Sequence, residues 1–331
     1  MVHYVCNNYG LITDGIGVYA KNVVNELNKR GVDVAVHTTN LSSNKRLFEL
    51  FSLRMTGCLF RLIPSVKRGD KIIIEYPFSE CNVIICIPLF FLFIKTRILR
   101  VHLILSLHEY LRVHFLRKLI IRWLINISDI LLLTDKSIVH ALKLKQKYFI
   151  REIPSNIVSH TIESVDEKNN QFLFFGLINK SKAFEEMLKG WCKFNKDKKC
   201  YLIIATSSQF RNIYENENVK CYQRLPDEKI AKLFQESKFC VLPIKPSIDK
   251  INATYKTCLS FQCIPIGYFG SKNKNFAVNL RGLSSDDFCE GFKTAVGLSQ
   301  DEINKNKLLI KNIDLPSFEK TASVYIDALS L

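Results

Sequence analysis

The chain has 331 residues, of which 47% are apolar, so it is long enough for two folded domains and is not a disordered chain. Its 47 Lys and Arg against 31 Asp and Glu give a net charge of +16, which predicts an anionic partner. Eleven scattered cysteines without a C-x-x-C pair indicate free thiols and exclude a disulfide framework or a zinc site of the usual spacing.

In the first half of the chain, short β-branched or apolar runs alternate with segments of helical spacing. Strands are expected at Val2–Cys6, Val32–Thr38, Lys71–Ile74, His102–Leu107 and Ile130–Thr134. Helices are expected at Ile16–Asn28, Leu111–Ile125 and from about Lys136. The second of these is predicted to bury an apolar side that consists of Leu116, Leu119, Ile120 and Trp123.

Two further stretches of this half stand out. The longest apolar run, Val83 to Ile94, is too short to cross a bilayer and is interpreted as a buried helix or strand, with membrane insertion as the alternative. The stretch from Lys95 to Arg151 holds twelve Lys and Arg and three acids, a net charge of +9. This basic stretch predicts contact with anionic lipid, a diphosphate-linked substrate or nucleic acid, and a solvated basic surface is the alternative.

The second half of the chain repeats the alternation of strands and helices. Strands are expected at Phe172–Phe175, Tyr201–Ala205, Val219–Tyr222, Phe239–Leu242 and Pro265–Tyr268, and helices at Asp227–Ser237, Thr254–Gln262 and Ser317–Leu331. Strand–helix alternation predicts parallel sheets with helices on both faces. The expected domains are 1–158 and 165–315, with 316–331 forming a helix that packs back toward the first domain.

Two strand-to-helix turns rich in glycine lie half a chain apart. In the first, Gly15, Ile16 and Gly17 precede a helix; in the second, Gly176 ends a strand and Lys182 follows. Such turns present free backbone amides at a helix N-terminus, where anionic groups bind. The first fits a loose dinucleotide motif, but the preceding loop is long and the second strand ends without the acid that holds a ribose. The two turns therefore favour a phosphorylated ligand over a nicotinamide cofactor.

Further candidates lie at the predicted carboxyl ends of strands, where open α/β sheets bind ligands. His108 and Glu109 follow one strand and Glu75 and Tyr76 end another; the alternative for His108 is to tie down a loop. In the second half, a polar loop opens a helix at Thr254, where capped amides and a nearby lysine suit a diphosphate. The residues of this helix start are Asp249, Lys250, Thr254, Tyr255, Lys256 and Thr257. A predicted base-binding edge comprises Arg224 and Leu225.

The order of these motifs resembles the GT-B glycosyltransferases of family 4 (glycosyl transferases group 1). Asp14-Gly15-Ile16-Gly17-Val18-Tyr19 is similar to the family's G-G-I-G-x-Y loop, and Ile153-Pro154-Ser155-Asn156 to its V-I-P-N link between domains. Gly176 with Lys182-Ala183, then Val241-Leu242-Pro243 and Cys263-Ile264-Pro265-Ile266, resemble motifs of its second domain. The resemblance covers nearly the whole chain, and each motif is degenerate. It implies two facing Rossmann-like domains.

The chain departs from the family at the donor site. The family's arginine after the first glycine of the second domain is Leu177 here, and its two glutamates, eight residues apart, fall on Lys250 and Cys258 or on Asp249 and Thr257. The resemblance thus implies that Lys182, Thr254, Tyr255 and Lys256 take over the diphosphate contacts, and that the identity of the donor and the activity itself depend on them.

The implied function is a retaining glycosyltransferase that moves a sugar from a nucleotide sugar to a lipid-linked or oligosaccharide acceptor in surface polysaccharide synthesis. It is expected to be cytoplasmic and peripheral on the inner face of the cell membrane, bound through the Lys95–Arg151 region, without a metal or other cofactor. The expected catalytic residues are His108, Lys182 and Lys256. The expected donor site comprises Gly15, Ile16, Gly17, Gly176, Arg224, Leu225, Asp249, Lys250, Thr254, Tyr255 and Thr257, and the acceptor site Glu75, Tyr76 and Glu109.

Three other functions are considered. A non-catalytic sugar-nucleotide-binding protein would keep the architecture without the glutamates, and a sugar-nucleotide epimerase would need no acceptor. A nucleic-acid-binding protein is disfavoured, since no aromatic residues interleave with basic ones in the manner of known modules.

Overall fold

A computed structural model of the chain describes residues 1–11, 15–39, 54–76, 78, 83–108, 110, 115–144, 146–157, 169–179, 181–197, 199–209, 218–248, 252–271 and 273–331. The chain divides into two compact units. Unit 1 comprises Met1–Ile153 with Pro316–Leu331, and unit 2 comprises Pro154–Leu315. Each unit is built around its own parallel sheet.

The unit 1 sheet has six parallel strands in the order β2-β1-β3-β4-β5-β6. Its strands are β1 (Val2–Asn7), β2 (Val34–Thr39), β3 (Lys71–Tyr76), β4 (His102–Leu107), β5 (Ile130–Leu133) and β6 (Lys147–Ile150). The central strands are apolar along almost their whole length because helices cover both faces of a parallel sheet.

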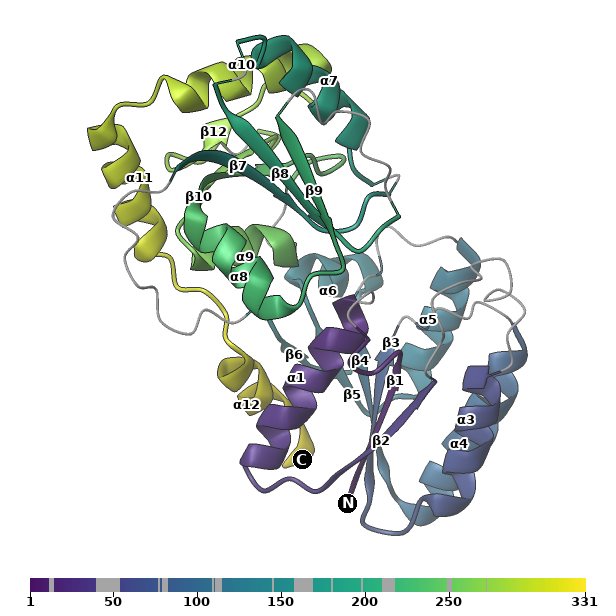
Figure 1. Ribbon diagram of the computed structural model, residues 1–331. Coiled ribbons are helices and arrows are strands. Elements are labelled where there is room, and N and C mark those ends of the chain that lie inside the picture. The colour runs from purple at the N-terminus through teal and green to yellow at the C-terminus, as the bar shows by residue number, and fades with distance from the viewer. Residues whose placement is uncertain are drawn as a thin grey trace. The chain divides into compact units, whose positions relative to one another are not determined.

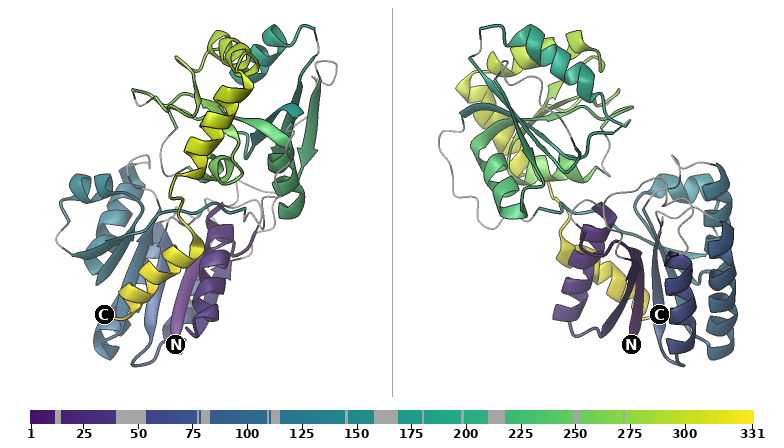
Figure 2. Two further views of the ribbon diagram at one scale, coloured as in Figure 1. Left: turned by 90° about the vertical axis from the view of Figure 1, so that its left-hand side faces the viewer. Right: turned by 45° about the vertical axis from the view of Figure 1, so that its right-hand side comes forward.

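The helices of unit 1 form two layers (Figures 1 and 2). On one face, α1 (Gly15–Lys29) packs with α12 (Phe318–Leu329), the helix that returns from the far end of the chain. The other face is covered by α3 (Arg54–Ser65), α4 (Cys86–Leu99), α5 (Phe115–Ile127) and α6 (Lys136–Leu142). A short 3-10 turn, η1 (Val83–Ile85), leads into α4.

The structure corrects three expectations about this unit. The run Val83 to Ile94 is helical, but it is not buried, because one whole face of α4 is exposed. Leu119, expected on the buried side of its helix, is 56% exposed. Arg151, counted as part of a basic surface, is 0% exposed and lies inside the unit.

The unit 2 sheet also has six parallel strands, in the order β12-β11-β10-β7-β8-β9. Its strands are β7 (Asn169–Phe175), β8 (Tyr201–Thr206), β9 (Val219–Gln223), β10 (Ser237–Leu242), β11 (Ile264–Gly267) and β12 (Val278–Asn279). The predicted fold class, α/β with parallel sheets and helices on both faces, is confirmed for both units.

The helices of unit 2 also lie on both faces of its sheet. One face is covered by α7 (Phe184–Phe194) and α10 (Ser285–Val296), which pack closely together around an aromatic cluster centred on Phe172 and Trp191. The other face holds α8 (Asp227–Glu236) and α9 (Ala253–Ser260), and α11 (Gln300–Lys311) contributes to both cores. Helices of this amphipathic kind gain most of their stability from such packing.

Candidate active site

In unit 1, a cluster of buried polar side chains surrounds Glu75 near the carboxyl ends of the strands. The Glu75 cluster, as it is called below, comprises Tyr4, Tyr19, Glu75, Ser106, His108, Arg151 and Tyr325. Glu75 is 0% exposed, and a buried carboxylate needs partners because burial without them costs several kcal/mol. Its partners come from β1, from the ends of β4 and β6, and from α12.

The contacts of Glu75 use both carboxylate oxygens. Its Oε2 lies 2.6 Å from His108 Nε2 and 3.5 Å from Arg151 Nη2. Its Oε1 accepts a hydrogen bond of 2.6 Å from the hydroxyl of Tyr4 and another from the hydroxyl of Tyr325. The carboxylate is therefore saturated by protein groups.

Burial raises the pKa of Glu75, but the positive charges of Arg151 and His108 and the hydrogen bonds from His108 and Tyr325 outweigh burial and lower it to about 2. Burial raises the pKa values of Tyr4 and Tyr325, so both hydroxyls keep their protons and donate. Since the ionised Glu75 can only accept, His108 must carry a proton on Nε2. The cluster thus fixes both the orientation of the imidazole and the site of one of its protons.

Arg151 is held mainly by aromatic faces. Its guanidinium lies 4.8 Å from the ring centre of Tyr19 and 5.9 Å from that of Tyr325, and its Nε donates to Ser106 Oγ at 3.0 Å. Among the described residues, its two terminal nitrogens have no hydrogen-bond acceptor. Cation–π contacts of this kind partly replace the lost hydration of a buried guanidinium.

The predicted residues of unit 1 fall into two groups. His108, at the end of β4, is 8% exposed. The rings of His108 and Tyr19 pack edge to face, with 4.9 Å between their centres. Glu75 and Tyr76, predicted to bind an acceptor, are 0% and 2% exposed, and the buried Glu75 carboxylate contacts His108. Glu109 lies outside the described residues.

The first turn of α1 lies close to the backbone of Asn8. A Cβ on Gly17 would lie 2.0 Å from the carbonyl oxygen of Asn8, so only glycine fits at this position. Gly17 is buried, Ile16 is half-buried and Gly15 is exposed, at the N-terminus of α1. Asp14, part of the resembling motif, lies outside the described residues.

In unit 2, the end of β7 and the start of α9 meet around one lysine. Gly176 follows β7 with a φ of +125°, and a Cβ there would lie 2.6 Å from Lys182 Nζ and 3.4 Å from Thr254 Oγ1. The missing side chain of Gly176 therefore leaves room for the ammonium group beside the first turn of α9. Asn252 caps that helix, its Oδ1 accepting from Tyr255 N at 2.9 Å.

Lys182 is half-buried, and burial lowers its pKa to about 8. Its Nζ lies 4.9 Å from the ring centre of Phe174. Within the part of the chain that the structure describes, no carboxylate pairs with this ammonium group and no hydrogen bond from it is present. A half-buried cation without a protein anion, next to a helix N-terminus, is suited to an anionic ligand.

The other predicted residues of unit 2 differ in their accessibility. Tyr255, Lys256 and Thr257 are 7%, 7% and 1% exposed, and the hydroxyl of Thr257 lies 2.8 Å from that of Ser155. Leu225 packs against the core, whereas Arg224 is exposed at the end of the edge strand β9. Asp249 and Lys250 lie outside the described residues. The structure thus brings Gly176, Lys182 and Thr254 together.

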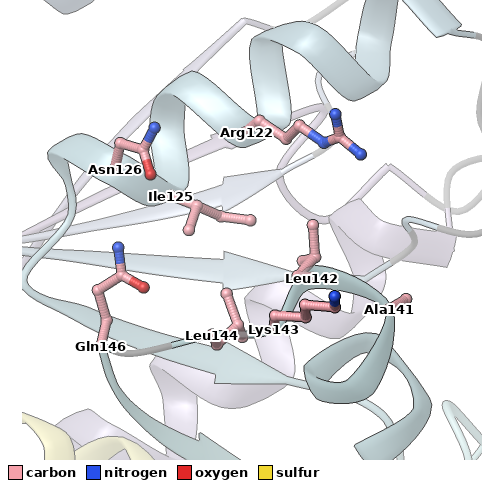
Figure 3. Close-up of a pocket in the computed structure, with 8 residues that line it drawn as sticks. All are labelled: Arg122, Ile125, Asn126, Ala141, Leu142, Lys143, Leu144 and Gln146. Atoms are coloured by element: carbon pink, nitrogen blue, oxygen red, sulfur yellow. The ribbon is translucent and has the colours of Figure 1, made fainter.

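A cavity of about 490 Å³ lies in unit 1 between α5 and the segment that joins α6 to β6 (Figure 3). It is lined by Arg122, Ile125, Asn126, Ala141, Leu142, Lys143, Leu144 and Gln146. None of the predicted site residues lines it. Among the described residues, no group of three or more His, Cys, Asp or Glu is placed to hold a metal ion.

No protein-family model matches the chain, and no curated protein matches it in sequence. Solved structures do match. One is Anabaena Alr3699/HepE in complex with UDP and glucose, with a TM-score of 0.67 and 10% identity over 100% of this chain and 99% of that one. Another is an alpha-glucosyltransferase in complex with UDP and a 13-mer DNA, with a TM-score of 0.68 and 13% identity over the same shares.

The pneumococcal O-GlcNAc transferase GtfA in complex with UDP and GlcNAc also matches, with a TM-score of 0.58 and 11% identity over 82% of this chain and 59% of that one. All three are GT-B glycosyltransferases. The chain has the GT-B fold. The predicted resemblance in fold is therefore confirmed, in a divergent sequence.

Proposed function

We propose that this GT-B protein is a glycosyltransferase of the retaining type, which moves a sugar from a nucleotide-sugar donor to a lipid-linked glycan acceptor in surface polysaccharide synthesis. The likeness to three structures that contain UDP supports a uridine diphosphate sugar as donor. The observation that carries the proposal is the half-buried Lys182, beside Gly176 and the first turn of α9, without an acidic partner among the described residues.

The role proposed for Lys182 follows from the charge that develops on the diphosphate leaving group. As the glycosidic bond of a nucleotide sugar breaks, negative charge builds on the diphosphate, and groups that stabilise this charge lower the barrier. The Lys182 ammonium group and the amides at the start of α9 are the groups proposed to do so, with Thr254 beside them. In this proposal the lysine supplies the positive charge, and no metal cofactor is required.

In unit 1, His108 is proposed to contact the transferred sugar or the acceptor. Glu75 is assigned the role of positioning residue, since its carboxylate holds His108 Nε2 at 2.6 Å and is itself fully buried. A fixed, protonated Nε2 leaves the imidazole in one orientation, which is what a sugar-binding group at a sheet edge requires. The backbone amides of Gly15–Gly17 are proposed as further donor contacts.

The test combines ligand binding with turnover. Nucleotide sugars are screened by thermal shift, because a ligand that binds only the folded state raises its melting temperature. The best ligand is then measured by calorimetry and by UDP release with Lys182→Ala and with the matched control Lys189→Ala, an exposed lysine on α7. We expect Lys182→Ala to lower turnover at least 100-fold and to weaken UDP binding, and Lys189→Ala to change neither.

Three other outcomes would contradict the proposal. Binding without transfer or UDP release, over a panel of acceptors, identifies a non-catalytic sugar-nucleotide-binding protein. Conversion of the bound sugar without an acceptor identifies an epimerase. Equal turnover in wild type and Lys182→Ala removes Lys182 from the site.

A further inference from the structure

The outer face of α4 is a continuous apolar stripe. Its exposed side chains, together with one from η1, are 38% to 74% exposed: Ile84, Ile87, Phe90, Phe91, Ile94 and Ile98. They recur at three- and four-residue spacing, so they share one side of the helix, while Pro88, Leu89, Leu92 and Thr96 face the core. Single exposed apolar residues are ordinary in proteins, but a contiguous stripe of six marks a surface that binds something.

The neighbouring helices extend this surface. α3 packs against α4 and exposes Phe60, and α5 exposes Phe115 and Leu119. These helices cover the same face of the unit 1 sheet, as the right-hand view of Figure 2 shows for α3 and α4 in blue. The outer side of α3, α4 and α5, defined by these nine apolar side chains, is called the α3–α5 face.

The charged side chains within α3, α4 and α5 all have one sign. Within the bounds of the three helices there is no Asp or Glu, and there are seven basic residues: Arg54, Arg61, Lys95, Arg97, Arg117, Lys118 and Arg122. In contrast, α7, α8, α10 and α11 of unit 2 each contain at least two acids. An acid-free basic rim around an apolar stripe complements a surface that is both apolar and anionic.

Among the described residues, four of these cations, Arg61, Lys95, Lys118 and Arg122, have no acidic partner. Arg97 pairs with Asp129 at 2.6 Å, but Lys95 donates to the carbonyl oxygen of Ile63. Arg122 Nε donates to the hydroxyl of Tyr110 at 3.1 Å, and Lys118 lies over the ring of Tyr110. Neutral acceptors and rings leave the net charge of the face in place, so it can attract anionic groups.

The cavity between α5 and α6 adds a polar recess to the same side of the sheet (Figure 3). The cavity is lined by the basic side chains of Arg122 and Lys143, by the amides of Asn126 and Gln146, and by the apolar side chains of Ile125, Leu142 and Leu144. Two cations and two amides around 490 Å³ are suited to a phosphate headgroup.

We propose that the α3–α5 face binds an anionic lipid bilayer. α4 lies parallel to the membrane with its apolar stripe among the headgroups, the basic rim contacts lipid phosphates, and the cavity beside α5 receives one headgroup. With 14 residues α4 is too short to span a bilayer, and no helix within the described residues is long and apolar enough to do so. Binding in the plane of the interface is the mode that suits such a helix.

A second copy of the chain suits this face poorly. In a two-fold symmetric dimer the same patch meets itself. The seven basic residues of these helices, which contain no acid, would then face the same seven basic residues of the second copy. The proposal rests on the proposed function in one respect, because membrane binding brings the enzyme to a lipid-linked acceptor. It differs from the expected contact through Lys95–Arg151, since the apolar stripe begins before Lys95 and Arg151 is buried.

The experiment uses the full chain and sedimentation with vesicles of phosphatidylcholine alone or with 30% phosphatidylglycerol. We expect at least tenfold stronger binding to the anionic vesicles, and a loss of most of that binding in 0.5 M salt. Phe90→Ser with Phe91→Ser should weaken binding at least tenfold. The control Leu308→Ser, at a leucine of α11 that is 60% exposed, should not change it.

The role of the cavity is tested with Arg122→Gln and Lys143→Gln against the control pair Lys189→Gln and Lys229→Gln in unit 2. The cavity pair should reduce binding to anionic vesicles severalfold more than the control pair. Unchanged melting temperatures show that the variants fold. Vesicle binding that is absent, or equal in wild type and the Phe90/Phe91 variant, overturns the proposal, and so does a dimer that this variant dissociates.

The membrane-binding proposal and the proposed function can be tested independently of each other. UDP affinity is measured on the same proteins without lipid, and it should be unchanged in every α3–α5 variant. Loss of vesicle binding with intact UDP binding contradicts the docking surface alone. Intact vesicle binding without any nucleotide-sugar binding contradicts the proposed function alone.

Discussion

At the carboxyl ends of the two sheets, the main charged groups differ in whether the protein supplies their partners. In unit 1, Glu75 accepts from Tyr4, His108 and Tyr325 and pairs with Arg151, so protein groups satisfy both oxygens of this buried carboxylate. In unit 2, Lys182 has no acidic partner within the described residues. The first arrangement is complete without a ligand, and the second leaves a charge for a ligand to neutralise.

This contrast separates positioning from binding. A closed ionic cluster in a low-dielectric interior holds its members rigidly, at the cost of desolvating them. An unpaired, half-buried cation lowers the stability of the folded state but gains more when an anion arrives. Substitutions in the two regions should therefore change the free energy of unfolding with opposite signs.

The largest effect is expected for Glu75→Gln. The substitution leaves the positive charge of Arg151 buried without its counterion, and breaking a buried pair in this way costs about 3–5 kcal/mol. Urea denaturation at pH 7 measures the loss. Glu302→Gln, on the exposed first turn of α11, is the control and should cost far less stability.

Acid titration sharpens this result. The pKa of Glu75 is lowered from 4.5 to about 2 in the folded protein, so its contribution is complete above pH 4.5 and is lost as the pH falls toward 2. A shift of this size corresponds to roughly 3 kcal/mol. The stabilities of wild type and Glu75→Gln should converge between pH 4.5 and 2. A constant difference over this range would show that charge is not what Glu75 contributes.

A smaller effect is expected for Tyr325→Phe. The variant keeps the ring over Arg151 but removes the hydroxyl that donates to Glu75 and lies 2.8 Å from Ser106 Oγ. A hydrogen bond to a charged group contributes about 1.5–3 kcal/mol, so the free energy of unfolding should fall by about 2 kcal/mol. Tyr148→Phe, at a tyrosine of β6 that is 42% exposed, serves as the control. Equal stability of the two variants would place Tyr325 outside the cluster.

The smallest effect, with the opposite sign, is expected for Lys182→Met without nucleotide. Because burial lowers the pKa of Lys182 from 10.5 to about 8, its charged form costs stability at pH 7, and this cost disappears as the pH rises from 8 to 10.5. Allowing for partial exposure, the variant should be more stable by about 1 kcal/mol at pH 7 and by much less at pH 10. Urea denaturation at both pH values measures this, with Lys189→Met as the control. A less stable variant at pH 7 would remove the contrast between the units.

The sheets were predictable from local pattern. Apolar runs, β-branched in Ile72–Ile74 and mainly aromatic in Phe172–Phe175, form strands because a parallel sheet buries both faces of its central strands. Gly17 and Gly176 also indicated local structure from the sequence. Gly17 avoids a clash with the Asn8 carbonyl, and Gly176 leaves room for the Lys182 side chain. Local sequence records such constraints directly.

The Glu75 cluster was not predictable as a unit. A glutamate inside an otherwise apolar strand indicates that partners exist, but Arg151 and Tyr325 reach it from positions 76 and 250 residues further along the chain. Leu119 shows the same limit, because helical spacing defines an apolar side and only the neighbouring elements decide how much of it is covered. The positions that depend on tertiary contacts were those missed.

The return of α12 to unit 1 affects how the protein is made. Translation supplies every residue of unit 2 before it reaches residues 316–331, which complete unit 1. Until α12 has been synthesised, unit 1 lacks the helix that packs against α1, and Glu75 lacks the hydroxyl of Tyr325. A stop codon after residue 315 would leave unit 2 complete and still remove a hydrogen-bond donor from Glu75, the partner of His108.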